Sequence, residues 1–419
     1  MFSARVAWDT PHNQLTQALR ALRQSASSPD LIDLAESNPT RVALLPEEEL
    51  RDLLAPLADP RGLCYAPDPR GLRAARVAIA DYYQGRGIGV DPDHLVLCAS
   101  TSEAYAWLFQ LLCDPGDQVL IPQPSYPLFG HLAGLCAVKA SPYPLRYDGR
   151  WRLHPSDLEE ALADPTARAL LHVSPNNPTG SYLHRGEQRV LDAGCARRGV
   201  ALIADEVFGD YPLRPEPEAG APAEEAIVPS LCAVDGEALC FVLSGLSKVL
   251  GLPQLKLGWI HTGGPLRARA QDRLELIADT FLSVGAPVQL AAASLLKEGA
   301  RLRAAIHARV RHNHEHLRAA VQGSACQLLH VEGGWYGVLR VPRVLCEEEW
   351  ALRLLREDHV LCHPGYFFDF PAEAYLVVSL LPAPERFRTG VARLLRRVEE
   401  ETAGDFCATG LHQAPVVLS

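Results

Sequence analysis

No apolar run in this 419-residue sequence is long enough to cross a membrane. The longest runs, such as 239–243, have the length of a strand, whereas a membrane helix needs about 20 apolar residues. The first residues, MFSARVAWDTPHNQ, lack the apolar core of a secretory signal. There is no basic tail or stripe, and the net charge of −10 comes from interspersed acidic and basic residues. These absences argue against a membrane or a nucleic acid as a partner.

Motifs for disulfides, phosphate loops and metals are also missing. The 11 cysteines are an odd number and no two of them form a CxxC spacing, which favours reduced thiols and a cytoplasmic protein. Neither GxxxxGK[ST] nor GxSxG occurs. His312 and His316 stand at i and i+4, but no third ligand follows at a metal-site spacing. We therefore expect a solvated histidine face and no metal.

Short apolar runs alternate with helical patterns through the middle of the chain. The runs cover 94–99, 118–122, 169–173, 200–204 and 239–243, and helical stretches include 103–113 and 186–198. Near-continuous apolar character suits strands that are buried on both faces of a parallel sheet. The alternation therefore predicts an α/β sheet with crossover helices.

The length of the chain and its outer segments predict more than one domain. An amphipathic helix is expected over 13–24 and one long helix over 287–321. After Gly323 the chain changes to a second pattern of strands and helices. We expect an N-terminal arm that joins the small domain over 1–45, a large domain over 46–290 and a small domain over 291–419.

Polar residues follow four of the predicted strands. The tripeptide 100–102 (STS) follows the first strand, and SPNNPTG (174–180) follows the run 169–173. Asp205 follows the run 200–204, and Lys248 comes five residues after the run 239–243. Ligands of open parallel sheets bind beyond the carboxyl ends of the strands. The sequence therefore predicts that a hydroxyl, an amide, a carboxylate and an amine meet at one edge.

These stretches carry a family resemblance. PNNPTG, DEVFGDY and SKVLGLPQLKLGW resemble, in order and spacing, the class I/II aminotransferases of fold type I, from about residue 36 to about residue 381. The resemblance implies a large α/β domain with a mostly parallel, mixed sheet and a small α+β domain. It also implies the cofactor pyridoxal 5'-phosphate (PLP), and it assigns 46–290 as the PLP-binding domain.

Three residues take catalytic roles from this resemblance. Lys248 resembles the Schiff-base lysine, a primary amine that condenses with the cofactor aldehyde and later moves a proton. Asp205 resembles the aspartate that keeps the pyridinium nitrogen protonated. Tyr126, in PSYPLF, resembles the aromatic residue that stacks on the cofactor ring. The alternatives are a surface lysine, a strand-end cap and a core tyrosine.

Further cofactor contacts follow from the same resemblance. Asn177 resembles the amide that bonds the ring 3-oxygen, although a turn residue is the alternative. A helix start preceded by Ser100, Thr101 and Ser102 suits a phosphate, although it also fits an ordinary helix cap. Lys256 stands where the family usually has an arginine on the phosphate, and a lysine loses the bidentate fork.

Two residues imply contacts with a neighbouring subunit and with the substrate. Tyr65, in YAPDPRGL, resembles a tyrosine that reaches the phosphate of the neighbouring subunit, with core packing as the alternative. Asn38, in ESNPTR, lies where the family often approaches the substrate with its backbone. Since twofold dimers are also the commonest oligomers, we expect a homodimer with a shared active site.

Two positions near the expected cofactor contacts depart from the family pattern. Phe208, which we still expect beside the cofactor, stands where many members have a tyrosine that also bonds the 3-oxygen. The phenolate form of the cofactor should therefore be less stabilised. Gly245 stands three before Lys248, where many members have a phosphate-binding serine, and Ser244 or Ser247 are the candidates to replace it.

A third departure concerns the substrate. Val377 occupies the position of the arginine that usually clamps the α-carboxylate, and a valine cannot bind a carboxylate. Arg41, Arg340 and Arg386 are the candidates for supplying the fork from another direction. The alternative is a substrate that lacks this carboxylate.

The sequence as a whole predicts a PLP-dependent aminotransferase. It would move an amino group from an amino-acid or amine donor to a 2-oxo acid by a ping-pong mechanism through a Lys248 Schiff base. A PLP-dependent lyase or eliminase of the same fold is one alternative, because fold does not settle function. A non-catalytic PLP-binding protein is the other.

Overall fold

The computed structural model describes residues 1–9, 13–24, 30–213 and 222–409, and these form two compact units. The large unit comprises residues 1–8, 38–308 and 330–335, and the small unit comprises 9–37, 309–329 and 336–419. The chain changes units at 37/38 and 308/309, where periodicity had placed domain boundaries at 45/46 and 290/291. In addition, the segment 330–335 belongs with the large unit.

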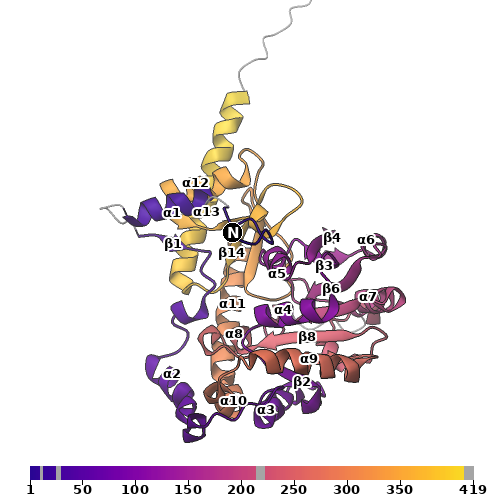
Figure 1. The fold of residues 1–419 in the computed structure, drawn as a ribbon. Helices are drawn as coiled ribbons and strands as arrows, with labels where there is room; N and C mark the ends of the chain where they lie inside the picture. The colour runs from indigo at the N-terminus through magenta and orange to yellow at the C-terminus, as the bar shows by residue number, and fades with distance from the viewer. Residues whose placement is uncertain (10–12, 25–29, 214–221, 410–419) are drawn as a thin grey trace, which may run out of the picture. The chain divides into compact units, whose positions relative to one another are not determined.

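An eight-stranded sheet forms the middle of the large unit (Figure 1). Its order is β2 (Leu95–Cys98), β9 (Gly258–Gly263), β8 (Cys240–Gly245), β7 (Ala201–Asp205), β6 (Ala167–Val173), β3 (Gln118–Gln123), β4 (Lys139–Tyr147) and β5 (Trp151–Leu153). Strands β8, β7, β6, β3 and β4 are parallel neighbours. β9 runs antiparallel between β2 and β8, and β5 is antiparallel to β4. The sheet is therefore mostly parallel and mixed, as predicted.

Helices α4 (Thr101–Leu112), α5 (Phe129–Leu135) and α9 (Arg267–Phe281) share one apolar core with the sheet. Alternate residues of the strands, such as Leu171, Ile203 and Leu243, contribute to it, because successive strand side chains point to opposite faces. Helices α6 (Pro155–Ala161) and α7 (Arg185–Arg198) pack against β4, β7 and each other. Helices α2 (Glu47–Leu54), α3 (Arg73–Gln84) and α10 (Ala286–Glu298) pack together, and α3 contacts β2. The short helix α8 (Leu246–Val249) follows β8 directly.

The strand and helix predictions hold for the middle of the chain. The five apolar runs are β2, β3, β6, β7 and β8, and the two helical stretches are α4 and α7. The single long helix expected over 287–321 is wrong, because the chain forms α10 and then α11 (Ala300–Ala320) with Gly299 between them. A Cβ on Gly299 would lie 2.8 Å from the Leu250 side chain. This close tertiary contact leaves no periodic signal in the sequence.

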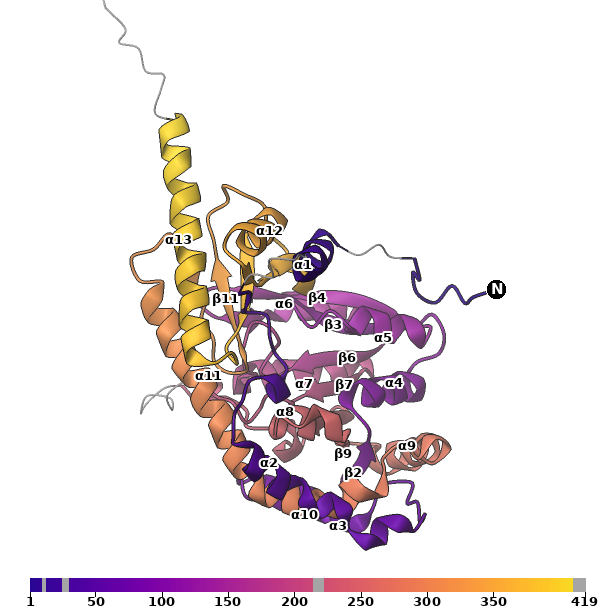
Figure 2. The ribbon, with the colours of Figure 1, turned by 90° about the vertical axis from the view of Figure 1, so that its left-hand side faces the viewer.

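The small unit combines helices with an antiparallel sheet of order β10 (Gln327–Leu328), β11 (Tyr336–Arg340), β14 (Tyr375–Ser379) and β13 (His363–Pro364). A separate parallel pair joins β1 (Ile32–Asp33) to β12 (Val360–Leu361). The predicted N-terminal helix is α1 (Gln14–Gln24), which lies beside α12 (Glu347–Glu357) (Figures 1 and 2). Helix α13 (Pro384–Thr409) ends the described chain. Among the described residues, no helix is both long and apolar enough to cross a membrane.

Candidate active site

The candidate active site lies at one edge of the large-unit sheet. β3, β6, β7 and β8 are parallel and end there, and β2 ends at the same edge because it runs in the direction of β8 with β9 between them. Gly258, at the start of β9, pairs with Cys98 on one side and Gly245 on the other. The predicted residues that come after the ends of these strands, or at an end, are Ser100, Thr101, Ser102, Tyr126, Asn177, Asp205 and Lys248. The edge therefore brings together the four chemical groups expected from sequence.

Lys248 of α8 lies among aromatic side chains. Its Nζ is 5.1 Å from the ring centroid of Trp335 and 5.6 Å from that of Phe208. The hydroxyl of Tyr211 donates to the Lys248 carbonyl oxygen at 2.6 Å. Burial lowers the pKa of the amine from 10.5, and the charge of Asp205 partly offsets this. A lowered pKa leaves more of the amine in its neutral, nucleophilic form.

Asp205 is the last residue of β7, and it is 7% exposed. The hydroxyl of Tyr105, on α4, donates to Oδ2, and the backbone N–H of Val207 donates to Oδ1 at 3.0 Å. Burial raises the pKa of the carboxyl, while these two hydrogen bonds and the charge of Lys248 lower it. Both carboxylate oxygens are thus held in place next to the amine-bearing helix.

The loop after β6 carries Asn177. The neighbouring Asn176 fixes this loop, since its Nδ2 donates to the Pro124 carbonyl oxygen at 3.1 Å and to Thr179 Oγ1 at 2.8 Å. Asn177 is 8% exposed, and its Oδ1 has no hydrogen-bond partner within the described part of the chain. A buried amide with unmet hydrogen-bonding capacity suits a polar group of a ligand.

The start of α4 provides positive potential at the same edge. Ser100 is the N-cap of this 12-residue helix, and its Oγ accepts from the N–H of Glu103 at 3.2 Å. The N–H groups of the first helical turn and the helix dipole favour an anion. Lys256 is exposed just before β9. Burial raises the pKa of the Cys98 thiol at the end of β2, and the charge of Lys256 offsets a small part of this increase. The start of α4 follows β2 and Lys256 precedes β9, and these two strands are neighbours in the sheet. Both groups can therefore attract an anion at this edge.

Tyr126 follows β3 and is partly exposed. Its ring packs edge-on against Phe129 with the centroids 5.8 Å apart. Burial and, to a smaller extent, the charge of Asp205 raise the pKa of its hydroxyl. Tyr126 therefore lies within electrostatic range of the β7 carboxylate.

This set of groups fits PLP. The unpartnered oxygen of the buried Asn177 amide, the amine of Lys248 with its lowered pKa and the Asp205 carboxylate match the polar functions of the cofactor. The start of α4 and Lys256 match its phosphate.

Comparisons with known proteins decide the family. Residues 29–397 match the family model for aminotransferase class I and II. The chain belongs to this family. It is a PLP-dependent aminotransferase, and neither the lyase nor the non-catalytic alternative is favoured.

The relatives of this aminotransferase are distant but cover most of its length. It is 25% identical over 394 residues to the glutamate-pyruvate aminotransferase AlaA of Haemophilus influenzae, which covers 90% of this chain and 92% of the relative. The 4-dedimethylamino-4-oxo-anhydrotetracycline transaminase OxyQ of Streptomyces rimosus is 29% identical, covering 89% and 95%. The arginine-pyruvate transaminase AruH of Pseudomonas aeruginosa is 28% identical, covering 80% and 82%.

Solved structures confirm the fold. The alanine aminotransferase of Pyrococcus furiosus superposes with a TM-score of 0.80 at 22% identity, covering 92% of this chain and 96% of the other. A Thermus thermophilus aspartate aminotransferase mutant gives a TM-score of 0.79 at 21% identity, covering 94% and 99%. The aminotransferase therefore has the predicted fold type I architecture.

Two predicted contact residues lie on segments before α3. Asn38 caps the short helix 39–41, with its Oδ1 accepting from the N–H of Thr40 at 3.0 Å. A Cβ on Gly251, three residues after Lys248, would lie 3.1 Å from the Pro39 side chain, so this segment lies next to α8. Tyr65 is 82% exposed, so it is not packed in the core of this chain.

Backbone packing explains the missing serine at position 245. The φ of Gly245 is 176°, an extended conformation open to any residue. A Cβ there would nevertheless lie 3.0 Å from both the Gly258 Cα and the Leu257 carbonyl oxygen. Both atoms belong to the backbone at the start of β9, which would have to move by a few tenths of an ångström to admit a side chain. Ser244, one of the two serines expected to replace the missing serine, is buried.

Val377 belongs to the core of the small unit. It lies in β14, is buried, and pairs with Val338 of β11 and His363 of β13.

Two of the three candidate arginines for the substrate carboxylate contact groups of the small unit. Arg340 donates to the Tyr375 hydroxyl at 3.4 Å, and Arg386 donates to Asp30 Oδ1 at 3.0 Å. Arg41 belongs to the large unit.

Three residues that lie near Lys248 or Asp205 were not predicted from the sequence. Tyr105 carried one signal, a polar-tipped aromatic residue on an otherwise apolar helix that begins at the strand edge. Tyr211 is the last residue of DEVFGDY and could have been singled out with that motif. Trp335 lies 87 positions from Lys248 in the chain, so no motif links the two residues. The preceding pair of glycines, which indicates a turn, was the one local signal.

Proposed function

We propose that this aminotransferase transfers an amino group from an amino acid to a 2-oxo acid in two half-reactions at one site. In this proposal Lys248 attaches the cofactor and moves the α-proton of the donor. The observation that carries the proposal is the buried amine of Lys248, with its lowered pKa, beside the β7 carboxylate of Asp205. Bound PLP supplies an electron-accepting ring, and Asp205 would keep the ring nitrogen protonated.

The other side chains would bind and orient the cofactor. Asn177 would hydrogen-bond the 3-oxygen, and Tyr126 would lie on the ring. Phe208 has no hydroxyl, so it would give the ring apolar contact and no second donor. The phosphate would be held at the start of α4, with Lys256 as its cation.

We infer that pyruvate is the acceptor. Two relatives from different organisms carry pyruvate in their names, whereas the donors named with it are glutamate and arginine. Because the two names share pyruvate and differ in the amino acid, they support the identity of the acceptor and not that of the donor. Arg41 is our candidate for the substrate carboxylate, because Arg340 and Arg386 contact small-unit side chains and Arg41 is on the Asn38 segment beside α8.

A second acceptor class is supported by one relative and one position. OxyQ is named for an oxo-anhydrotetracycline, and buried Val377 provides no carboxylate clamp. A cyclic ketone without a carboxylate is therefore the alternative acceptor.

The first experiment separates these possibilities. A panel of amino acids is added to the PLP-loaded enzyme without an oxo acid, and the visible absorbance of the cofactor is followed. The proposal expects the visible band to fall and to return on addition of pyruvate. Release of ammonia with an unchanged band contradicts transamination. Return of the band with a cyclic ketone but not with pyruvate selects the alternative acceptor.

A second experiment tests Arg41. The Arg41→Ala variant should raise KM for the amino acid about 10-fold or more, the loss expected for a charge-assisted carboxylate contact. Activity with an amine donor that lacks a carboxylate should not change. An equal loss with both donors argues against a carboxylate contact.

The homodimer remains part of the proposal. Tyr65 and Leu63 are exposed on one short segment, which supports a contact with a second copy. The test mixes two inactive variants, Lys248→Ala and Tyr65→Ala, after unfolding and refolding them together. Random pairing should restore roughly a quarter of the sites, since half of the dimers are mixed and each mixed dimer has one intact site. Absence of any recovery contradicts a shared site. Ten of the eleven cysteines, those whose side chains the structure describes, are free thiols, which supports a cytoplasmic setting.

A further inference from the structure

Residues 330–335, here called the strap, belong to the large unit although both flanking segments belong to the small unit. The N–H groups of Glu332 and Gly333 donate to the Gly180 carbonyl oxygen at 3.1 and 3.0 Å. The N–H of Gly334 donates to the Tyr211 carbonyl oxygen at 2.9 Å. A Cβ on Gly180 would lie 2.5 Å from the Gly333 carbonyl oxygen. The strap is therefore seated closely against the loop that carries Asn177.

The strap ends in Trp335, which is fully buried. Its ring lies 5.2 Å from the ring of Phe208 and 5.2 Å from that of Tyr211, both edge-on. The Nζ of Lys248 is 5.1 Å from its centroid. The position of the strap therefore determines where the Trp335 ring lies relative to the Lys248 amine.

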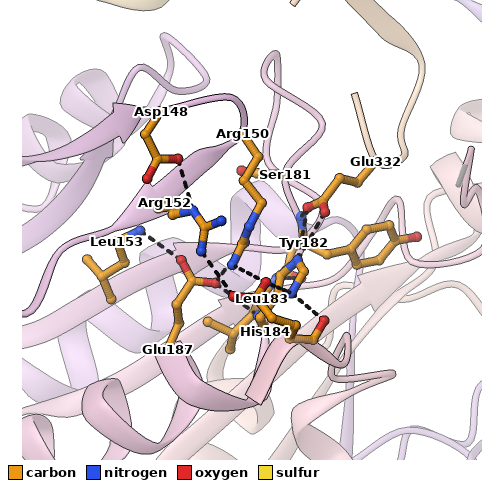
Figure 3. A network of polar contacts seen from close by, with 12 residues as sticks. Asp148, Arg150, Arg152, Leu153, Ser181, Tyr182, Leu183, His184, Glu187 and Glu332 are labelled. Atoms are coloured by element: carbon orange, nitrogen blue, oxygen red, sulfur yellow. Dashed lines mark hydrogen bonds and ion pairs between the residues drawn. The ribbon is translucent and has the colours of Figure 1, made fainter. Parts of the chain in front are cut away.

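A buried ion-pair contact lies three residues before Trp335 (Figure 3). The Nε2 of His184 is 3.0 and 3.3 Å from the two carboxylate oxygens of Glu332, and both side chains are 1% exposed. The backbone N–H of Tyr182 donates to Glu332 Oε2 at 2.9 Å. The other ring nitrogen of His184 is 2.7 Å from the Glu225 carbonyl oxygen.

These distances require one shared proton. A carbonyl oxygen only accepts, so Nδ1 of His184 carries a hydrogen toward Glu225. A carboxylate also only accepts, so the contact of Nε2 with Glu332 needs a second proton on either the ring or the carboxyl. Without that proton, lone pairs would face each other in a site that water does not reach, which is costly.

The surrounding charges favour placing this proton on His184. Glu225 Oε2 lies 3.7 Å from the ring Nδ1 of His184, and Glu187 Oε2 accepts from the backbone N–H of His184 at 3.1 Å. Arg150 pairs with Glu187 at 3.3 Å and with Glu225 at 3.1 Å. Arg152 pairs with Glu225 at 3.2 Å and with Asp148 at 2.9 Å. The net charge of the cluster is the same wherever the proton lies. On His184, however, the proton places a cation between the carboxylates of Glu332, at 3.0 Å, and Glu225, at 3.7 Å, and it leaves Glu332 ionised to accept from the Tyr182 N–H.

We propose that protonated His184 and ionised Glu332 form a positioning pair that seats the strap and thereby holds Trp335 against Lys248. Neither residue touches the reacting atoms, so both act through Trp335. The functional part of the inference rests on the proposed role of Lys248, while the proton on His184 does not.

The first test measures the proton directly. Protein with ¹⁵N-labelled histidine is compared with the His184→Gln variant at pH 7 to assign the ring signals. The expected wild-type ring has both nitrogens protonated. In Glu332→Gln the amide donates to Nε2 and accepts from the Tyr182 N–H, so the ring should be neutral with hydrogen on Nδ1 alone. A neutral wild-type ring overturns the proposal, whatever the role of Lys248.

The second test measures position in the PLP-loaded enzyme. Glu332→Ala should weaken the circular dichroism of the bound cofactor and lower kcat about 100-fold, the scale expected for a misplaced site. Glu332→Gln should retain both within about threefold, because it keeps both hydrogen bonds. Glu224→Gln is the control, since Glu224 is exposed and pairs with exposed Arg189 at 2.7 Å. Wild-type dichroism and kcat in folded Glu332→Ala would overturn the proposal.

Discussion

Tyr105 of α4 donates a hydrogen bond to Oδ2 of Asp205 at the end of β7, and both side chains are buried. This bond lowers the pKa of the carboxyl against the opposing effect of burial. It therefore stabilises the ionised form that the proposed pairing with the cofactor ring needs. The phenol also competes for the same carboxylate, so Tyr105 sets how strongly Asp205 acts on the ring nitrogen.

The Tyr105→Phe substitution removes only this hydroxyl. The pKa of Asp205 is raised in the folded protein, so stability falls as pH rises from 3.8 through the folded value. Loss of the hydrogen bond raises this pKa further. We expect a cost of about 1.5–3 kcal/mol at pH 8, where the bond is to a charged group, and a smaller cost at pH 4. Urea unfolding of the cofactor-free protein at both pH values measures it. Equal costs at the two pH values would contradict this role.

Replacing Lys248 tests the attachment of the cofactor. Lys248→Ala should lose the visible absorption band of the enzyme-bound cofactor and all turnover, because no other primary amine occupies this position. Lys248→Arg is the charge-preserving control and should lose both properties as well. Absorption spectra after addition of PLP provide the measurement. A retained band in either variant would rule out Lys248 as the attachment point.

The lowered pKa of Lys248 predicts a pH effect in the cofactor-free protein. The folded state releases this proton more readily than the unfolded state, whose lysine has the ordinary value of 10.5. Its contribution to stability therefore rises with pH from the folded pKa up to 10.5. Lys248→Met should remove this slope. The check is thermal unfolding between pH 7 and pH 10, and parallel curves for the two proteins would refute the prediction.

Introducing the family's serine at position 245 should harm this chain. The new Cβ would lie 3.0 Å from the backbone of β9, so we expect Gly245→Ser to cost about 1–3 kcal/mol, as overpacking does. Gly130→Ser is the control, because Gly130 has open space around the built Cβ and an exposed position in α5. It should change stability by less than about 0.5 kcal/mol. Similar losses in both variants would show that the contact with β9 is not the cause.

Phe208→Tyr restores the hydroxyl that many family members have. Phe208 lies edge-on to Trp335 and near Lys248. The added donor should stabilise the deprotonated 3-oxygen of the bound cofactor, and its spectral titration should shift to lower pH. The Phe208→Leu variant lacks the donor and should show no such shift. An unchanged midpoint in the tyrosine variant would place its hydroxyl away from the 3-oxygen.

Much of the fold could be predicted from the sequence because the local pattern of apolar residues matches the burial of the strands. Continuous apolar runs mark strands covered on both faces, and all five predicted runs became strands of the sheet. Because carboxyl ends of parallel strands meet at one edge, the order of motifs was enough to bring Lys248, Asp205 and Asn177 together. The prediction of one helix over 287–321 was wrong at Gly299, where a Cβ would lie 2.4 Å from the Leu295 carbonyl oxygen and 2.8 Å from the Leu250 side chain, so local geometry and tertiary packing both favour glycine there.

The sequence by itself determined the strands, the family and the groups at the edge of the sheet, because these depend on residues close together in the chain. Tertiary structure alone decided which distant side chains act on them. Tyr105 is 100 positions from Asp205, and His184 is 148 positions from Glu332. Such pairs leave no period or motif, since their geometry arises only when packing brings the segments together and excludes water from the bonds between them.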